Sequence, residues 1–178
     1  SVAVDEGPDL DIAAFLATGH LGISVHGVTT SVGYEYLSGD DDTSDDRQEN
    51  FDVLFGTNHK FYGHIDYFLN NSANTAGLGL QDIVARLRVP LASHVVVGMG
   101  LHWFLTAEQD ATRLEGASSF GQELDTWIKY KYNHALGMRA GYSGFVPDDA
   151  LSARFRNADP SDDRRHASVA HWGYAMID

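Results

Sequence analysis

The 178-residue chain contains no cysteine, so it can form neither a disulfide nor a thiolate metal site. Positive charge is scarce: 12 Lys and Arg stand against 25 Asp and Glu, for a formal net charge of −13. This balance argues against non-specific binding to nucleic acid. No apolar run approaches the ~18 residues that a transmembrane helix needs. The mean hydropathy of −0.24 does not exclude a membrane β-barrel, because polar and apolar residues alternate along its strands and their hydropathies average out.

The N-terminal stretch SVAVDEGPDLD lacks the basic and apolar regions of a signal peptide. We expect either that the protein is not secreted or that translation began before Ser1. The length suits one domain, residues 1–178, with room for a core or a modest barrel.

Apolar and polar residues alternate in steps of two along most of the chain, which is typical of β-strands with one buried face. Residues 15–25 and 28–36 are two such runs, and the His26-Gly27 step between them predicts a hairpin. In that register Gly19 lies opposite Tyr34, whose ring we expect to cover the bare backbone. Further strands are predicted over 82–91, 94–105, 123–132, 136–143 and 168–178. A helical spacing of apolar residues over 80–89 leaves a helix there as the alternative.

The connections between the predicted strands are of two kinds. Those near 26–27, 91–93 and 133–135 are tight, whereas those over 38–60, 106–121 and 146–167 are long and polar. Outer-membrane barrels have this asymmetry, with short turns in the periplasm and long loops outside. The predicted strands before and after residues 61–68 run in opposite directions, so the chain between them begins and ends outside and has no further membrane crossing. We therefore expect residues 61–68 in an outer hairpin or folded into the barrel mouth. Residues 38–79 are predicted to form a long extracellular acidic and aromatic loop region.

Aromatic residues end the apolar faces of these strands. They lie beside the long loops and beside one tight turn, at Tyr34, Tyr36, Trp103, Tyr142, Tyr130 and Tyr132. Membrane interfaces favour such girdles of rings. A soluble barrel or sandwich would bury this apolar face instead. The glycine-rich opposite face and the position of the rings at strand ends favour the membrane barrel.

Several strings occur together in the order and spacing of one family: EYLSGDD, FDVLFGTNHKFYGHIDYF, GLGLQD, GQELD, GYSGF and HWGYAMID. Over residues 30–178 the chain resembles the C-terminal half of the alginate-export family of bacterial outer-membrane porins. The resemblance implies an all-β, antiparallel transmembrane β-barrel in a Gram-negative outer membrane, which passes solutes by diffusion. The best-known members export an anionic polysaccharide through a pore lined by Arg and Lys. About seven strands are an odd number below the usual minimum, so we expect the C-terminal part of a larger barrel.

If the apolar face meets lipid, the opposite face lines the lumen. Its acidic residues lie near the long-loop ends, at Glu35, Asp82, Glu123 and Asp125. Its basic residues lie nearer the tight turns, at Arg86, Arg88, Lys129, Lys131 and Arg139. A three-residue turn at 133–135 would place Lys129 directly across from Arg139. We hypothesise that the five cations form an anion-attracting belt, and the alternative that acids of further strands neutralise them stays equally open.

The stretch FYGHIDYF, residues 61–68, gathers rings, one His and one Asp before a glycine-rich segment. We interpret 61–79 as a folded constriction or gating loop. In this interpretation the rings of Phe61, Tyr62, Tyr67 and Phe68 pack onto the barrel mouth, and His64 and Asp66 hydrogen-bond inside the loop. Because sugars often stack on aromatic rings, contact of Tyr62 and Tyr67 with a glycan is a second hypothesis.

Other chemistry has little support in the sequence. His59, His64 and Asp66 could ligate zinc, but their spacing matches no metal motif, and the loop SGDDDTSDDRQENFD lacks the order of a calcium loop. No G-x-S-x-G nucleophile motif occurs. We therefore predict no catalytic residue, no metal and no cofactor. Expected partners are membrane lipid, small or oligosaccharide solutes and envelope proteins; the alternatives are a structural, partner-binding barrel with a plugged lumen and a soluble β-barrel binding protein.

Overall fold

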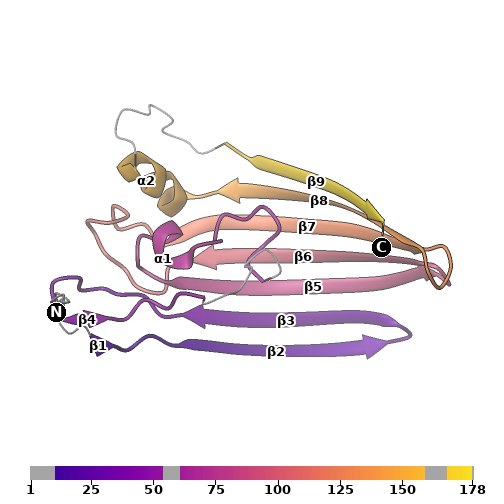
Figure 1. Ribbon diagram of the computed structural model, residues 1–178, viewed down its shortest axis with the longest axis horizontal. Coiled ribbons are helices and arrows are strands. Elements are labelled where there is room, and N and C mark those ends of the chain that lie inside the picture. The colour runs from indigo at the N-terminus through magenta and orange to yellow at the C-terminus, as the bar shows by residue number, and fades with distance from the viewer. Residues whose placement is uncertain (1–10, 54–60, 159–167, 178) are drawn as a thin grey trace, which may run out of the picture.

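The computed structural model describes residues 11–53, 61–158 and 168–177 (Figure 1). Seven long strands form one antiparallel sheet: β2 (Leu16–Val25), β3 (Val28–Leu37), β5 (Leu80–Ala92), β6 (Val95–Leu105), β7 (Ser119–Lys131), β8 (Gly137–Pro147) and β9 (Ala170–Ile177). Each strand pairs with the long strands next to it in the chain, and β2 and β9 lie at the two edges (Figure 1). The predicted all-β antiparallel fold is confirmed, and the helix considered over 80–89 is wrong because this segment is β5.

Short turns lie at one end of the sheet and long connections at the other (Figure 1). The β2–β3 hairpin closes through His26 and Gly27, whose φ angles of 50° and 82° are those of a type I′ turn. Between β5 and β6 the turn falls at Ser93 and His94, slightly later than predicted. The register shifts between Pro90 and Ala92, where a proline without an N–H group fits an irregular ladder.

The long connections carry the remaining elements. A two-residue parallel pair joins β1 (Asp11–Ile12) to β4 (Arg47–Gln48), and α1 (Asn71–Asn74) is a single turn. Helix α2 (Asp149–Ala158) lies in a stretch that the sequence predicted as loop, and it buries Ala150, Leu151 and Ala153. Neither helix in the described ranges is long and apolar enough to cross a membrane.

The two faces of the sheet have opposite environments. The predicted apolar face, with residues such as Val32, Ile83 and Met99, is exposed, and we call it the outer face. The other, inner face is covered at the long-loop end by residues 61–79 and α2. The buried core there combines sheet residues with residues from the connections: Leu37, Leu80, Phe104, Phe120 and Phe145 with Tyr62, Phe68, Leu78, Leu114 and Leu151. A soluble barrel would bury its apolar face, so this exposed apolar face is the arrangement expected of a sheet that faces lipid.

Glycine and ring pairs differ between the two faces. Gly19 pairs with Tyr34 as predicted, but no atom lies within 4 Å of a Cβ built at Gly19, so the ring does not cover it. The Tyr34 hydroxyl instead donates to Gln81 Oε1 at 2.6 Å. Rings cover directly paired glycines on the inner face, in three pairs: His20 with Gly33, Trp127 with Gly98, and Tyr174 with Gly141.

Candidate functional site

Cross-strand pairing places the inner-face residues in rows that run across the sheet. Three rows lie toward the tight turns: Val96–Lys129–Arg139–Met176; Thr29–Arg88–Gly98–Trp127–Gly141–Tyr174; and Ser31–Arg86–Gly100–Asp125–Ser143–Trp172. Two rows lie toward the long loops: Gly33–Val84–His102–Glu123–Phe145 and Glu35–Asp82–Phe104–Gly121. Basic residues are therefore confined to the rows nearer the tight turns, and acidic residues begin at Asp125.

All five predicted cations lie on the inner face. Arg88 and Lys131 are exposed, and Arg86, Lys129 and Arg139 are half-buried. Lys129 is the direct cross-strand partner of Arg139, as the sequence predicted. The Arg139 guanidinium lies 5.5 Å from the centre of the Trp127 ring, within the range of a cation–π contact.

Four of these cations have no acidic partner on the inner face of the described residues. Within the described part of the chain, no carboxylate forms an ion pair with Arg86, Arg88, Lys131 or Arg139. These four cations and the acids thus remain unpaired with one another, although Arg86 and Asp125 lie in the same row.

The four inner-face acids are buried: the exposed fraction is 7% for Glu35, 0% for Asp82, 1% for Glu123 and 4% for Asp125. A buried carboxylate needs partners, and histidine supplies them for three of the four. His20 Nε2 lies 3.3 Å from Glu35 Oε1. His102 joins two more acids, with Nδ1 2.8 Å from Asp82 Oδ2 and Nε2 3.8 Å from Asp125 Oδ2.

The sequence placed these acids at the correct end of the sheet but did not reveal their burial or the role of His102. The alternation of apolar and polar residues does put His102 on the inner face with these acids, and this feature of the sequence could have predicted their contact. Ser143 was also missed, and its hydroxyl donates to Asp125 Oδ1 at 2.5 Å.

Segment 61–68 forms no strand and lies against the inner face, in agreement with the parity prediction. The Phe68 ring centre lies 4.6 Å from that of Phe104, and the Tyr67 ring centre lies 4.6 Å from that of Phe145. Tyr62 is only 3% exposed, so its ring offers no face to a sugar, and the glycan hypothesis is wrong for this residue. Phe61 is 43% exposed and stays outside the core.

The polar contacts of this segment reach β7. His64 Nδ1 lies 3.4 Å from Asp125 Oδ1, and the backbone N–H groups of His64 and Ile65 donate to Glu123 Oε1 at 2.5 and 2.9 Å. The sequence predicted hydrogen bonds inside the loop and did not predict these contacts between the loop and β7. Asp66 is half-buried and has a left-handed backbone, with φ of 67°.

Burial affects the two tyrosines of the segment. It is the main cause that raises the pKa of Tyr62, and the charge of Glu35 adds to the effect. Burial also raises the pKa of Tyr67, with the charge of Glu123 as the second cause. Both hydroxyls therefore stay protonated at neutral pH and can act as donors.

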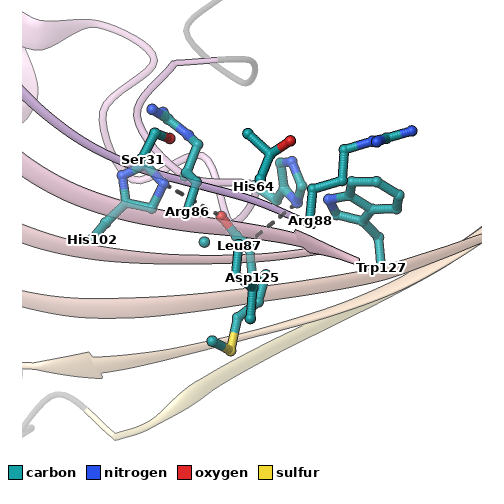
Figure 2. Close-up of a pocket in the computed structure, with 12 residues that line it drawn as sticks. Ser31, His64, Arg86, Leu87, Arg88, His102, Asp125 and Trp127 are labelled. Carbon is teal, nitrogen blue, oxygen red and sulfur yellow. Dashed lines mark ion pairs between the residues drawn. The ribbon is translucent and has the colours of Figure 1, made fainter. Parts of the chain in front are cut away.

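A cavity of about 290 Å³ lies on the inner face between the basic and acidic rows. Its polar lining comes from Thr29, Ser31, Arg86, Arg88, His64, His102 and Asp125, and Leu87, Met99, Trp127 and the glycines Gly63 and Gly100 complete the wall. Figure 2 shows both arginines and Trp127 around the same hollow as the His64–Asp125 and His102–Asp125 pairs. The cavity thus joins two predicted cations with the predicted loop, whereas Lys129, Lys131 and Arg139 lie outside its lining.

The weaker candidates form no site in the described ranges. His59 lies outside the described residues, and no three His, Asp or Glu side chains within those ranges could hold a metal ion. In the acidic loop, Asp42 Oδ1 accepts from Ser44, and Asp45 Oδ1 accepts from the backbone N–H of Arg47.

A sheet of long antiparallel strands, apolar toward the outside and charged or small toward the inside, defines a protein of the outer-membrane β-barrel class. The chain belongs to the alginate-export family, whose sequence model, described as alginate export, matches residues 28–166. This family comprises outer-membrane transport proteins and is not a family of enzymes, so it indicates export or porin function in general. A comparison with curated proteins found no match.

Proposed function

We propose that the inner face lines an outer-membrane pore that admits anionic solutes, small or oligomeric and including polysaccharide-type anions. The observation that carries this proposal is the separation of charge on the inner face. The acids are buried and bonded within the protein, whereas Arg86, Arg88, Lys131 and Arg139 have no carboxylate partner in the described ranges. Rings of Arg and Lys select anions in pores because they offset the cost of removing water from the solute.

The cavity supplies a place where an anion would pause. Arg86 and Arg88 bring two guanidinium groups, which bind carboxylates through paired hydrogen bonds. Thr29 and Ser31 on the adjacent strand add hydroxyls beside them. Lys129 and Arg139 form a like-charged cross-strand pair closer to the tight turns, and an anion between them would relieve their repulsion.

Segment 61–68 narrows the passage in this proposal. Gly63 and His64 line the cavity, and Tyr62 and Phe68 anchor the segment in the core. The long-loop end, including residues 38–79, then faces the outside of the cell, and the tight turns face the periplasm. The acidic stretch within 38–79 is the surface where envelope proteins would bind.

The test is the ion selectivity of the full-length protein in a planar bilayer under a KCl gradient. We expect an anion-selective reversal potential that falls toward zero in an Arg86→Gln, Arg88→Gln double variant, because Gln keeps the hydrogen-bonding size without the charge. Arg47→Gln is the matched control, since Arg47 of β4 pairs with Glu49, away from the inner face. Cation selectivity, or a double variant equal to the parent, would overturn the proposal.

One observation favours a second candidate, a barrel whose lumen is plugged. The aromatic core formed by Phe68, Phe104, Phe120 and Phe145 fills the inner face at the long-loop end. A correctly folded barrel that passes no current would support a structural or partner-binding role over transport.

A further inference from the structure

We propose that Glu123 is a positioning residue that holds segment 61–68 against the inner face and so sets the width of the cavity. Its effect on transport rests on the proposed function, but its effect on the segment does not. Glu123 acts on the backbone of the segment and needs no contact with a solute.

The carboxylate of Glu123 is fitted into a turn of the segment. Its Oε1 atom accepts the N–H groups of two consecutive residues, His64 at 2.5 Å and Ile65 at 2.9 Å. The preceding residue, Gly63, has φ of +80°, and consecutive N–H groups after such a residue form an anion-binding nest. A Cβ at Gly63 would lie 2.7 Å from Oε1 and still closer to the other carboxylate atoms. Glycine is therefore required by both the conformation and the space.

Because Glu123 is buried, no other group can easily take over its hydrogen bonds to the segment, which we call the anchor. The residue is 1% exposed, so water has little access to take over the two N–H groups. It lies on β7, which is paired with β6 through His102 and with β8 through Phe145 at this row. A carboxyl group held in the middle of the sheet gives the segment a fixed reference point, because the two backbone N–H groups that it accepts would otherwise be buried without an acceptor.

The anchor lies between two apolar attachments of the segment. Tyr62 and Phe68 are buried in the core on either side, and Ile65 and Tyr67 pack against it, which leaves Gly63 and His64 as the part that depends most on Glu123. Gly63 and His64 of this part line the cavity. The contact of His64 with Asp125 is a side-chain contact, whereas Glu123 binds the main chain. Loss of Glu123 would thus move one wall of the cavity while the rest of the segment stays docked.

The experiment measures access to the segment by cysteine labelling. Because this chain has no cysteine, Ile65→Cys introduces a single thiol into it, at a half-buried site next to the anchor. The rate of reaction with a charged methanethiosulfonate reagent is measured on the folded, full-length barrel in lipid vesicles. We expect Glu123→Ala to raise the rate about tenfold, because two backbone N–H groups at a buried site lose their acceptor. Glu123→Gln keeps an acceptor oxygen on a side chain of the same length and should stay closer to the parent than Glu123→Ala does.

Asp82→Asn is the matched control. Asp82 is as deeply buried as Glu123, but its hydrogen bond goes to His102 on β6. This variant should leave the labelling rate at position 65 unchanged, and a His134→Cys reporter in the β7–β8 turn, outside the cavity lining, should show no change in any variant. Equal rates at position 65 in the parent and in Glu123→Ala would overturn the inference, whether or not the protein conducts ions.

A second variant keeps the test decisive if Glu123→Ala does not fold. Gly63→Ala leaves Glu123 in place but fills the space that the carboxylate occupies. We expect faster labelling at position 65 here as well, and an unchanged rate would contradict the inference. Failure of anion selectivity together with faster labelling would refute the proposed function and leave the anchor intact.

Discussion

His102 shows how a single inner-face residue can stabilise several buried charges. It lies between Asp82 and Asp125, and its ring stacks on Phe104 with 5.4 Å between ring centres. Ion pairs in such places do not always add stability, since removing both charges from water is costly. Removing only one partner is different, because the remaining charge stays buried without compensation.

We predict that His102→Ala lowers the free energy of unfolding by about 3–5 kcal/mol, since Asp82 and Asp125 lose their shared partner. Urea unfolding of the barrel in detergent micelles measures this difference. His94→Ala is the control, because His94 lies exposed in the β5–β6 turn, and it should change stability by less than about 0.5 kcal/mol. Equal effects of the two substitutions would show that His102 does not hold the acids.

At the scale of strands and loops, alternation was enough to find the sheet. It located the seven long strands and the register of pairs such as Gly19–Tyr34 and Lys129–Arg139, because the side-chain period of a strand is fixed at two. It could not find α2, whose buried residues among those described, Ala150, Leu151, Ser152 and Ala153, form one short consecutive run without a helical period. It also could not show which loop covers the inner face, since that depends on contacts between residues about sixty positions apart, as between His64 and Glu123.

The ring-covered glycines give a prediction about the strands themselves. Gly98→Ala places a methyl group where the Trp127 ring lies, so we expect a loss of about 1–3 kcal/mol in the free energy of unfolding. The displaced ring would also leave Arg139, and Trp fluorescence should shift as its environment changes. Gly19→Ala is a matched substitution in open space and should be neutral or slightly stabilising. A neutral Gly98→Ala would mean that Trp127 does not need this glycine.

The direction of the edge strands constrains the whole molecule. β2 and β9 both run from the long-loop end toward the tight turns, because seven antiparallel strands begin and end in the same direction. Two such sheets placed side by side around one axis would therefore meet through parallel strands. A fully antiparallel barrel that includes this sheet needs an odd number of additional strands, which gives the even total of bacterial outer-membrane barrels.

The orientation of the molecule gives the last prediction. If the long-loop end faces outward, a cysteine at Asp45 in the β3–β5 connection should react in intact cells with a maleimide attached to a polymer too large to enter a pore. A cysteine at His134, in the β7–β8 turn, should react only after the outer membrane is permeabilised. The two sites form a matched pair, because both are exposed and polar and the chain has no other thiol. Labelling of His134→Cys but not Asp45→Cys in intact cells would reverse the orientation. The acidic stretch would then face the periplasm, and anions arriving from there would meet it before reaching Arg86 and Arg88.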